Sequence, residues 1–216
     1  MLHFHHCQGH ALQIHKPKHI LVLKIFRKRA ATRTMQDLIS NSYSKEEAIR
    51  FSQYTISQTD KETIAQAGSD ILKNTPKLPY TCALMSALWG AFIRDNTYIP
   101  THVVAGNLLI NGRKIFFNND SSEKVKQVFE TSNYSWDGHV WVSFAGTIGD
   151  ISIFRSAYSE PQDHWLHQLI VNEFGKGRGL VLGSPPNMTY EAKYVLTDNQ
   201  ITALIKSFRT AIESRH

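Results

Sequence analysis

The sequence predicts an α+β fold in which helices come first and an antiparallel sheet follows. Between residues 45 and 94, apolar side chains recur at spacings of three and four, the pattern of helices with a buried face. After residue 100 the apolar side chains alternate with a spacing of two, and the pair Asn111-Gly112 separates two such stretches. Helices and strands that are segregated along a chain are typical of α+β domains.

The helices expected before the sheet span residues 45–57, 60–73 and 81–94. Thr59 or Asp60 is the candidate N-cap of the second helix, because a side-chain oxygen there can accept a free backbone N–H. Pro76 and Pro79 end this helix, since proline lacks the N–H that a helix interior needs. The third helix is apolar nearly all round, as a central buried helix is, and it carries Cys82 in its first turn.

The sheet is expected to be an antiparallel meander that begins with a hairpin. Asn111-Gly112 is a preferred pair for a type I′ turn, and residues 145–146 are the expected turn of a second hairpin. Gly175 is expected to end a later helix. The expected strands span residues 101–110, 113–117, 138–144, 150–155, 179–183 and 190–196. The helices expected between and after them span residues 121–131, 161–174 and 198–214.

The positive charge of the chain is concentrated at its beginning. The 216 residues carry a formal net charge of +6, and residues 1–34 hold seven basic residues and no acidic residue. Residues 35–216 hold 17 basic and 18 acidic residues, so they lack the basic surface of a nucleic-acid-binding protein. We therefore expect residues 1–34 to be a disordered tail or sequence upstream of the true start. Residues 35–216 are expected to form a single domain without a nucleic-acid partner.

Signals for metal binding and for membranes are weak. Six of the eleven histidines and Cys7 lie in the first 34 residues, where they offer metal ligands, but an unstructured tail is the simpler explanation. His164 and His167 have a metal-compatible spacing without a third ligand nearby. The apolar stretch 20–26 is far shorter than the ~20 residues of a membrane span. With two cysteines in all, the chain fits a reducing compartment, and we expect a cytoplasmic protein without metal, cofactor or membrane contact.

A glycine-rich stretch at residues 175–179 (Gly-Lys-Gly-Arg-Gly) has the composition of a phosphate-binding loop. Its context is the reverse of the usual one, because it follows an expected helix and precedes an expected strand. We therefore interpret it as a connector or a lid.

Cys82 is the only cysteine of residues 35–216, and it opens the central apolar helix. Unpaired N–H groups and the positive end of the helix dipole at this position favour a thiolate and can donate to an oxyanion. The structural alternative is a buried apolar cysteine. A nucleophilic cysteine also needs a base and a group that orients the base, and His139 and Asp150 are the candidates.

Strand geometry predicts that His139 and Asp150 share a face of the sheet. If residues 145–146 form a two-residue turn, Trp141 lies opposite Asp150, and His139 lies opposite Ser152. Residues two apart on one strand project to the same side, so all four side chains share one face. Asp150 is then diagonal to His139 and within reach of its imidazole.

These features resemble the transglutaminase-like branch of the papain-like cysteine hydrolase and acyltransferase superfamily. The matching pieces are a cysteine that opens an apolar helix (Cys82), the stretch His139-Val140-Trp141-Val142 on a later strand, and Asp150 on the next strand. The resemblance covers about residues 81–155 and favours a bacterial domain of this type. It implies a papain-like α+β fold in which the central helix that bears the cysteine packs on an antiparallel β-sheet.

The resemblance also implies a function. Cys82 would be the nucleophile, His139 the base and Asp150 the orienting group of a thiol-dependent hydrolase or acyltransferase. The substrate would be an amide or thioester of a small molecule or peptide, converted through an acyl-enzyme. The alternative is a catalytically silent fold that acts as a binding module, and the oligomeric state stays open.

Two aromatic residues are additional candidates for contacts to the substrate or to the oxyanion. Tyr80 precedes Cys82 by two residues, and it is either such a contact or a half-buried loop aromatic. Trp141 follows His139 by two residues, and it either flanks the acyl group or packs in the core of the sheet.

Overall fold

The computed structural model describes residues 34–77, 81–131 and 136–213. The chain divides into two units, residues 1–32 and residues 33–216, and all described residues belong to the second unit. The expectations for residues 1–33 therefore lie outside the described residues. In the described part, no helix combines the length and the apolar character needed to cross a bilayer.

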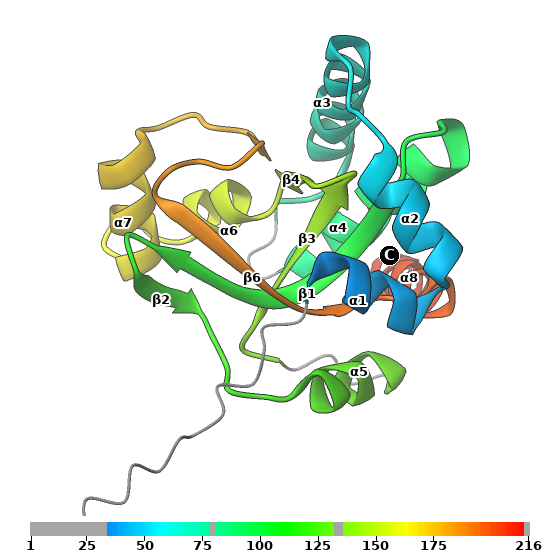
Figure 1. The fold of residues 1–216 in the computed structure, drawn as a ribbon. Coiled ribbons are helices and arrows are strands. Elements are labelled where there is room, and N and C mark those ends of the chain that lie inside the picture. Colours follow the sequence, from blue (N-terminus) through cyan, green and yellow to red (C-terminus); the bar gives the residue numbers. More distant parts are fainter. Residues whose placement is uncertain (1–33, 78–80, 132–135, 214–216) are drawn as a thin grey trace, which may run out of the picture. The chain divides into compact units, whose positions relative to one another are not determined.

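The described residues form eight helices and six strands, which confirms the predicted α+β class (Figure 1). The helices are α1 (Met35–Ser42), α2 (Lys45–Gln53), α3 (Gln58–Asn74), α4 (Cys82–Asn96), α5 (Ser122–Glu130), α6 (Ile153–Ser159), α7 (Trp165–Phe174) and α8 (Asp198–Glu213). The strands are β1 (Thr101–Ile110), β2 (Arg113–Phe116), β3 (His139–Phe144), β4 (Thr147–Asp150), β5 (Val181–Leu182) and β6 (Met188–Val195).

The strands form one antiparallel sheet with the order β2-β1-β3-β4-β5, and β6 pairs with β1 outside this path. Strand β1 is the centre of the sheet because it pairs with three others. It contacts β3 through residues 101–106, β2 through residues 108–110 and β6 through residues 104–110. Figure 1 shows β6 (orange) running along β1 (green).

Both predicted hairpin turns are confirmed. The turn residues have positive φ, with 50° at Asn111, 73° at Gly112, 44° at Ala145 and 89° at Gly146. Type I′ turns need this backbone conformation at both central positions. The second turn fixes the β3–β4 register, in which Val142 pairs with Gly149, Ser143 with Ile148 and Phe144 with Thr147.

Helices pack on both faces of the sheet. Val140, Val142 and Phe144 of β3 point toward α4, where they join the apolar side chains of that helix. On the opposite face, Trp141 packs against α1 and α2, and Leu108 packs against α6 and α7. Figure 1 shows these two pairs of helices at opposite ends of the sheet. The face of the sheet that carries His139 and Trp141 is therefore covered by α1 and α2 at one end and by α6 and α7 at the other.

The expected strand at residues 150–155 is wrong. Strand β4 ends at Asp150, and the chain enters α6 at Ile153. The Asp150 carboxylate accepts hydrogen bonds from the backbone N–H groups of Ser152 and Ile153, at 2.8 and 3.1 Å. These bonds satisfy free N–H groups at the start of α6. The chain therefore forms a helix from Ile153, although the apolar residues of this stretch alternate as in a strand.

The second expected helix starts earlier than its pattern indicated. Helix α3 begins at Gln58, and Ser57 is its N-cap in place of Thr59 or Asp60. The Ser57 hydroxyl accepts the Asp60 N–H, and the Asp60 carboxylate accepts the Ser57 N–H, which together form a capping box.

Candidate active site

Cys82 is the first residue of α4, and its thiol is free and half-buried. The preceding residue, Thr81, makes no side-chain capping hydrogen bond. By contrast, α1, α2, α3 and α5 each begin at a serine or threonine whose side chain accepts a backbone N–H. The start of α4 therefore offers N–H groups and the positive end of a helix dipole beside the thiol.

His139 and Asp150 lie on the same face of the sheet and form a hydrogen bond, as the strand geometry predicts. The atoms Nε2 of His139 and Oδ2 of Asp150 are 2.7 Å apart. The two side chains are buried, with 1% and 0% of their surface exposed. Since the β3–β4 turn sets the register of this pairing, the local hairpin alone brings the two groups together.

Three additional residues donate hydrogen bonds to the Asp150 carboxylate. The Tyr190 hydroxyl donates to Oδ2 at 3.0 Å, and the Ser152 hydroxyl donates to Oδ1 at 2.8 Å. The N–H groups of Ser152 and Ile153 also donate to Oδ1. Burial by itself raises the pKa of Asp150, but His139 and these hydrogen bonds outweigh it and hold the pKa below its usual range. Asp150 is therefore a buried and ionised carboxylate.

The His139 imidazole is held as a cation at neutral pH. Burial lowers its pKa, but the charge and hydrogen bond of Asp150, together with Cys82, outweigh burial and raise the pKa to about 10. The ring stacks on Phe116, with centroids 5.1 Å apart and an angle of 11° between the planes. Trp141 and Tyr190 lie around the same ring, with centroids 6.4 and 6.2 Å away. These aromatic neighbours fix the orientation of the imidazole.

The second ring nitrogen of His139 is left for Cys82. Nδ1 is buried and has no hydrogen-bond partner with good geometry among the described residues. Cys82 is nevertheless near enough to the ring to contribute to the raised pKa of His139. The sulfur is therefore close to the ring, in a contact that lacks the geometry of a fully formed hydrogen bond. Such contacts tighten when a substrate binds.

A cleft of about 460 Å³ opens beside Cys82. Its lining consists of Cys82, residues 114–117 in and after β2, residues 136–138 before β3, and Ser156 of α6. Phe116 connects this lining to the histidine, because its ring stacks on His139. The thiol therefore faces a space that is large enough for a small acyl group and has a partly aromatic wall.

Trp136 belongs to the cleft wall, and Gly138 makes room for its indole. A Cβ atom at Gly138 would lie 2.2 Å from Cη2 of Trp136, closer than any real contact. The ring also packs edge-on against Phe129, with centroids 5.7 Å apart. Its Nε1 is buried without a hydrogen-bond partner among the described side chains. This part of the wall therefore presents an aromatic surface to the cleft.

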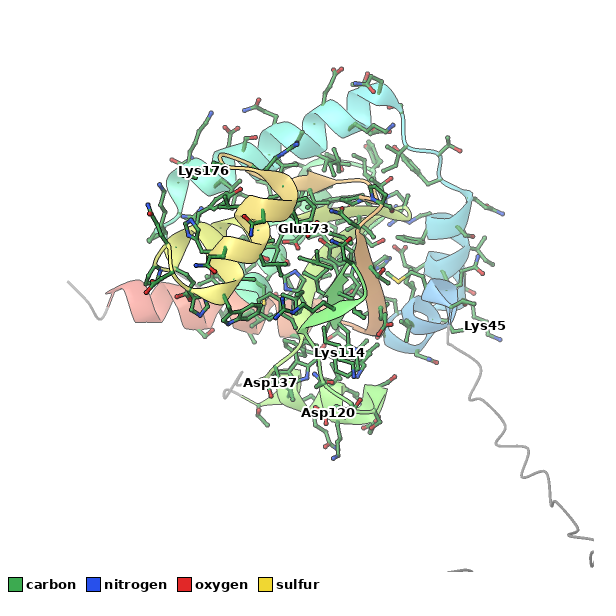
Figure 2. All side chains as sticks on the ribbon, turned by 90° about the vertical axis from the view of Figure 1, so that its left-hand side faces the viewer. Lys45, Lys114, Asp120, Asp137, Glu173 and Lys176 are labelled. Carbon is green, nitrogen blue, oxygen red and sulfur yellow. The ribbon has the colours of Figure 1, made fainter. Side chains whose placement is uncertain are left out.

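The cleft is also lined by one exposed charge of each sign. Lys114 of β2 and Asp137 before β3 both line it, and Figure 2 labels both side chains. The Lys114 ammonium lies 3.8 Å from the centroid of the Phe117 ring. Among the described residues that line the cleft, the exposed charges are therefore balanced.

The remaining predicted site residues have different outcomes. Tyr80 lies outside the described residues. Trp141 is only 3% exposed and packs against α1 and α2, and it does not line the cleft. The core alternative for Trp141 is therefore the one that the structure supports. His164 caps α7, and the described residues contain no group of three metal ligands.

Sequence reasoning missed three residues of this site: Phe116, Trp136 and Tyr190. The first two come from segments on either side of α5, and Tyr190 comes from β6, 40 residues after Asp150. Their local patterns predict only a strand or a loop. Tyr190 could be recognised as a site residue only once the pairing of β6 with β1 was known.

Comparison of the chain with protein-family models, with curated proteins and with solved structures found no match. The resemblance to transglutaminase-like proteins therefore rests on the residues of this chain and on their arrangement.

Proposed function

We propose that this protein is a thiol-dependent hydrolase or acyltransferase of the papain-like, transglutaminase-like type. The observation that carries the proposal is the buried hydrogen bond between His139 and Asp150, next to a half-buried Cys82 that lines a cleft. The order of the three residues along the chain, and a cysteine-bearing helix packed on an antiparallel sheet, agree with this proposal.

In the proposed mechanism, the Cys82 sulfur attacks the carbonyl carbon of an amide or thioester. The carbonyl oxygen becomes an oxyanion, and the free N–H groups at the start of α4 donate hydrogen bonds to it. The C–N or C–S bond then breaks, and His139 gives its proton to the leaving amine or thiol. Water or an amine attacks the acyl-enzyme next, gives a proton back to His139 and releases the acyl product.

Asp150 has a defined role in this mechanism. Its carboxylate accepts a hydrogen bond from Nε2–H of His139, so Nδ1 is the nitrogen that exchanges a proton with the thiol and the leaving group. Its negative charge stabilises the imidazolium, which holds the proton that the leaving group receives. Tyr190, Ser152 and Ile153 hold the carboxylate in place, so the imidazole keeps one orientation through the reaction.

The energetics of the buried pair favour a chemical role over a purely structural one. Moving two charges out of water is costly, and a buried ion pair often stabilises a fold no more than apolar residues of the same volume. His139 and Asp150 are almost fully buried, and one end of the pair lies beside the single thiol of residues 35–216. A reactive cysteine gives this costly arrangement a function, which a binding module would not need.

The test is covalent labelling of the full chain, followed by intact-protein mass spectrometry. Iodoacetamide at pH 6 and a panel of acyl thioesters and activated amides are the probes. We expect one rapid adduct on wild-type protein and on Cys7→Ser, and none at that rate on Cys82→Ser. An ordinary thiol is only about 0.3% ionised at pH 6, so a thiolate at Cys82 should react at least about tenfold faster than free cysteine. Labelling no faster than free cysteine would favour the binding module.

A further inference from the structure

A second pocket is separate from the Cys82 cleft, and the described residues that line it include three cations and no acid. It has a volume of about 250 Å³, and Lys77, Arg155 and Arg178 contribute to its lining. Gly177 and Gly179 of the glycine-rich connector between α7 and β5 also line it. Residues 35–216 are nearly neutral as a whole, with 17 basic and 18 acidic residues. Three cations around one small pocket are therefore a local concentration of charge.

Arg155 is the most unusual of the three, because it is buried. It is 8% exposed, and its two terminal nitrogens donate to the carbonyl oxygens of Leu72 and Thr75 at the end of α3. Its Nε is buried without a hydrogen-bond partner among the described residues. Burial accounts for the lowered pKa of this group, and no described carboxylate forms an ion pair with it. A buried guanidinium without a counterion is costly unless an anion pairs with it.

Lys77 and Arg178 have no acidic partner either. In the part of the chain that the structure describes, neither side chain forms a salt bridge. The Arg178 Nε donates to the carbonyl oxygen of Phe174, and its terminal nitrogens make no hydrogen bond to a described residue. A role for Arg155 in capping the C-terminal end of α3 explains the hydrogen bonds of its two terminal nitrogens. It explains neither the free Nε nor the two neighbouring cations.

We propose that this pocket binds a phosphate group. A phosphoryl group carries nearly two negative charges at neutral pH and several acceptor oxygens, which suit three cationic donors better than a single carboxylate does. Arginine nitrogens are well matched to phosphate oxygens. The glycines at 177 and 179 expose the backbone of the loop to the pocket without a side chain in the way. The pocket is separate from the proposed thiol chemistry, although α6 contributes Ser156 to the cleft and Arg155 to this pocket.

The test is titration of the full chain with inorganic phosphate at constant ionic strength, followed through the amide NMR signals of Gly177 and Gly179. We expect saturable shifts in wild-type protein and a dissociation constant at least about tenfold higher in the double variant Lys77→Gln/Arg178→Gln. Both side chains are exposed, so this variant should keep the near-ultraviolet circular dichroism of the wild type. Arg155→Lys, which keeps the charge but loses the guanidinium, should also weaken binding.

Lys176→Gln is the matched control. Lys176, which Figure 2 labels, is an exposed cation on the same loop. It is not among the residues that line the pocket. Its substitution should leave the dissociation constant within about twofold. Absence of saturable shifts, or an equal loss of affinity in Lys176→Gln and in the double variant, would overturn the proposal.

A second titration identifies the source of the phosphate group. O-phosphoserine serves as a phosphate ester, and serine as its unphosphorylated counterpart. Tighter binding of the ester than of inorganic phosphate would indicate a phosphorylated ligand, and the reverse order would indicate the free anion. Equal shifts with serine and O-phosphoserine would show that the phosphate group is not recognised.

Discussion

His139 and Asp150 meet across the two-residue turn at Ala145-Gly146, with Nε2 and Oδ2 2.7 Å apart. The pair is buried, and Tyr190 from a distant strand donates to the same carboxylate oxygen at 3.0 Å. The imidazole is thereby held as a cation with one nitrogen occupied and the other left for Cys82.

Asp150→Asn should slow the labelling of Cys82 at pH 6 by at least about tenfold, toward the rate of free cysteine. The amide keeps the shape of the side chain but loses the charge that stabilises the imidazolium. Asp137→Asn is the matched control, because Asp137 is an exposed carboxylate that also lines the cleft. We expect it to label at nearly the wild-type rate. Wild-type reactivity in folded Asp150→Asn would exclude Asp150 from the mechanism.

The stability of the protein should fall as the pH rises from about 6.5 to about 10. The pKa of His139 is about 10 in the folded state and about 6.5 in an unfolded chain, so the folded state holds the extra proton in this window. One proton gives a slope of at most about 1.4 kcal/mol per pH unit. Urea unfolding at several pH values measures it. The slope should be smaller in His139→Gln, and equal slopes would contradict a raised pKa at His139.

Stability should also fall in acid, because of Asp150. The pKa of this carboxylate is held below its ordinary value, so its contribution is complete above about pH 4 and is lost as the pH falls through the folded-state pKa. Asp150→Asn should show a smaller loss of unfolding free energy between pH 5 and pH 3 than wild-type protein does. An identical acid profile would show that other carboxylates cause the loss.

Tyr190→Phe should lower the free energy of unfolding by about 1.5 to 3 kcal/mol, because it removes a hydrogen bond to a charged group. Tyr194→Phe is the matched control, since the Tyr194 hydroxyl donates to the neutral Gln200 side chain at 3.0 Å. It should cost about 0.5 to 1.5 kcal/mol and leave the pH dependence of Cys82 labelling unchanged. A larger loss of unfolding free energy in Tyr194→Phe than in Tyr190→Phe would contradict a strong hydrogen bond between Tyr190 and Asp150.

Gly138→Ala should displace Trp136 from the cleft wall. The new Cβ would lie 2.2 Å from the indole, so the ring has to move, and tryptophan fluorescence should shift to longer wavelength. Gly179→Ala is the control, because its Cβ would meet only Leu72, at 3.8 Å. Unchanged fluorescence and unchanged labelling of Cys82 in Gly138→Ala would show that a glycine at 138 is not required to place Trp136 in the cleft wall.

The sequence by itself determined the hairpins, the class of the fold and the approach of His139 to Asp150. These features depend on local chemistry: positive φ at Asn111-Gly112 and Ala145-Gly146, and the alternation of side chains along β3. Once the second turn is fixed, the side chains at 139 and 150 have one relative position. Local reasoning failed at residues 150–155, because the alternating pattern there is compatible with a strand. The capping of Ser152 and Ile153 by Asp150 selects a helix instead.

Only the tertiary structure decided what surrounds the pair. Phe116 reaches His139 because β2 pairs with β1, and Tyr190 reaches Asp150 because β6 pairs with β1. Likewise, the buried Arg155 and the exposed Arg178 line one pocket although 23 residues separate them in the sequence. Such neighbours are set by long-range strand pairing and helix packing, whose energies depend on the whole core. A local pattern contains no information about these energies, so it predicts a pair across a turn but not the partners from distant elements.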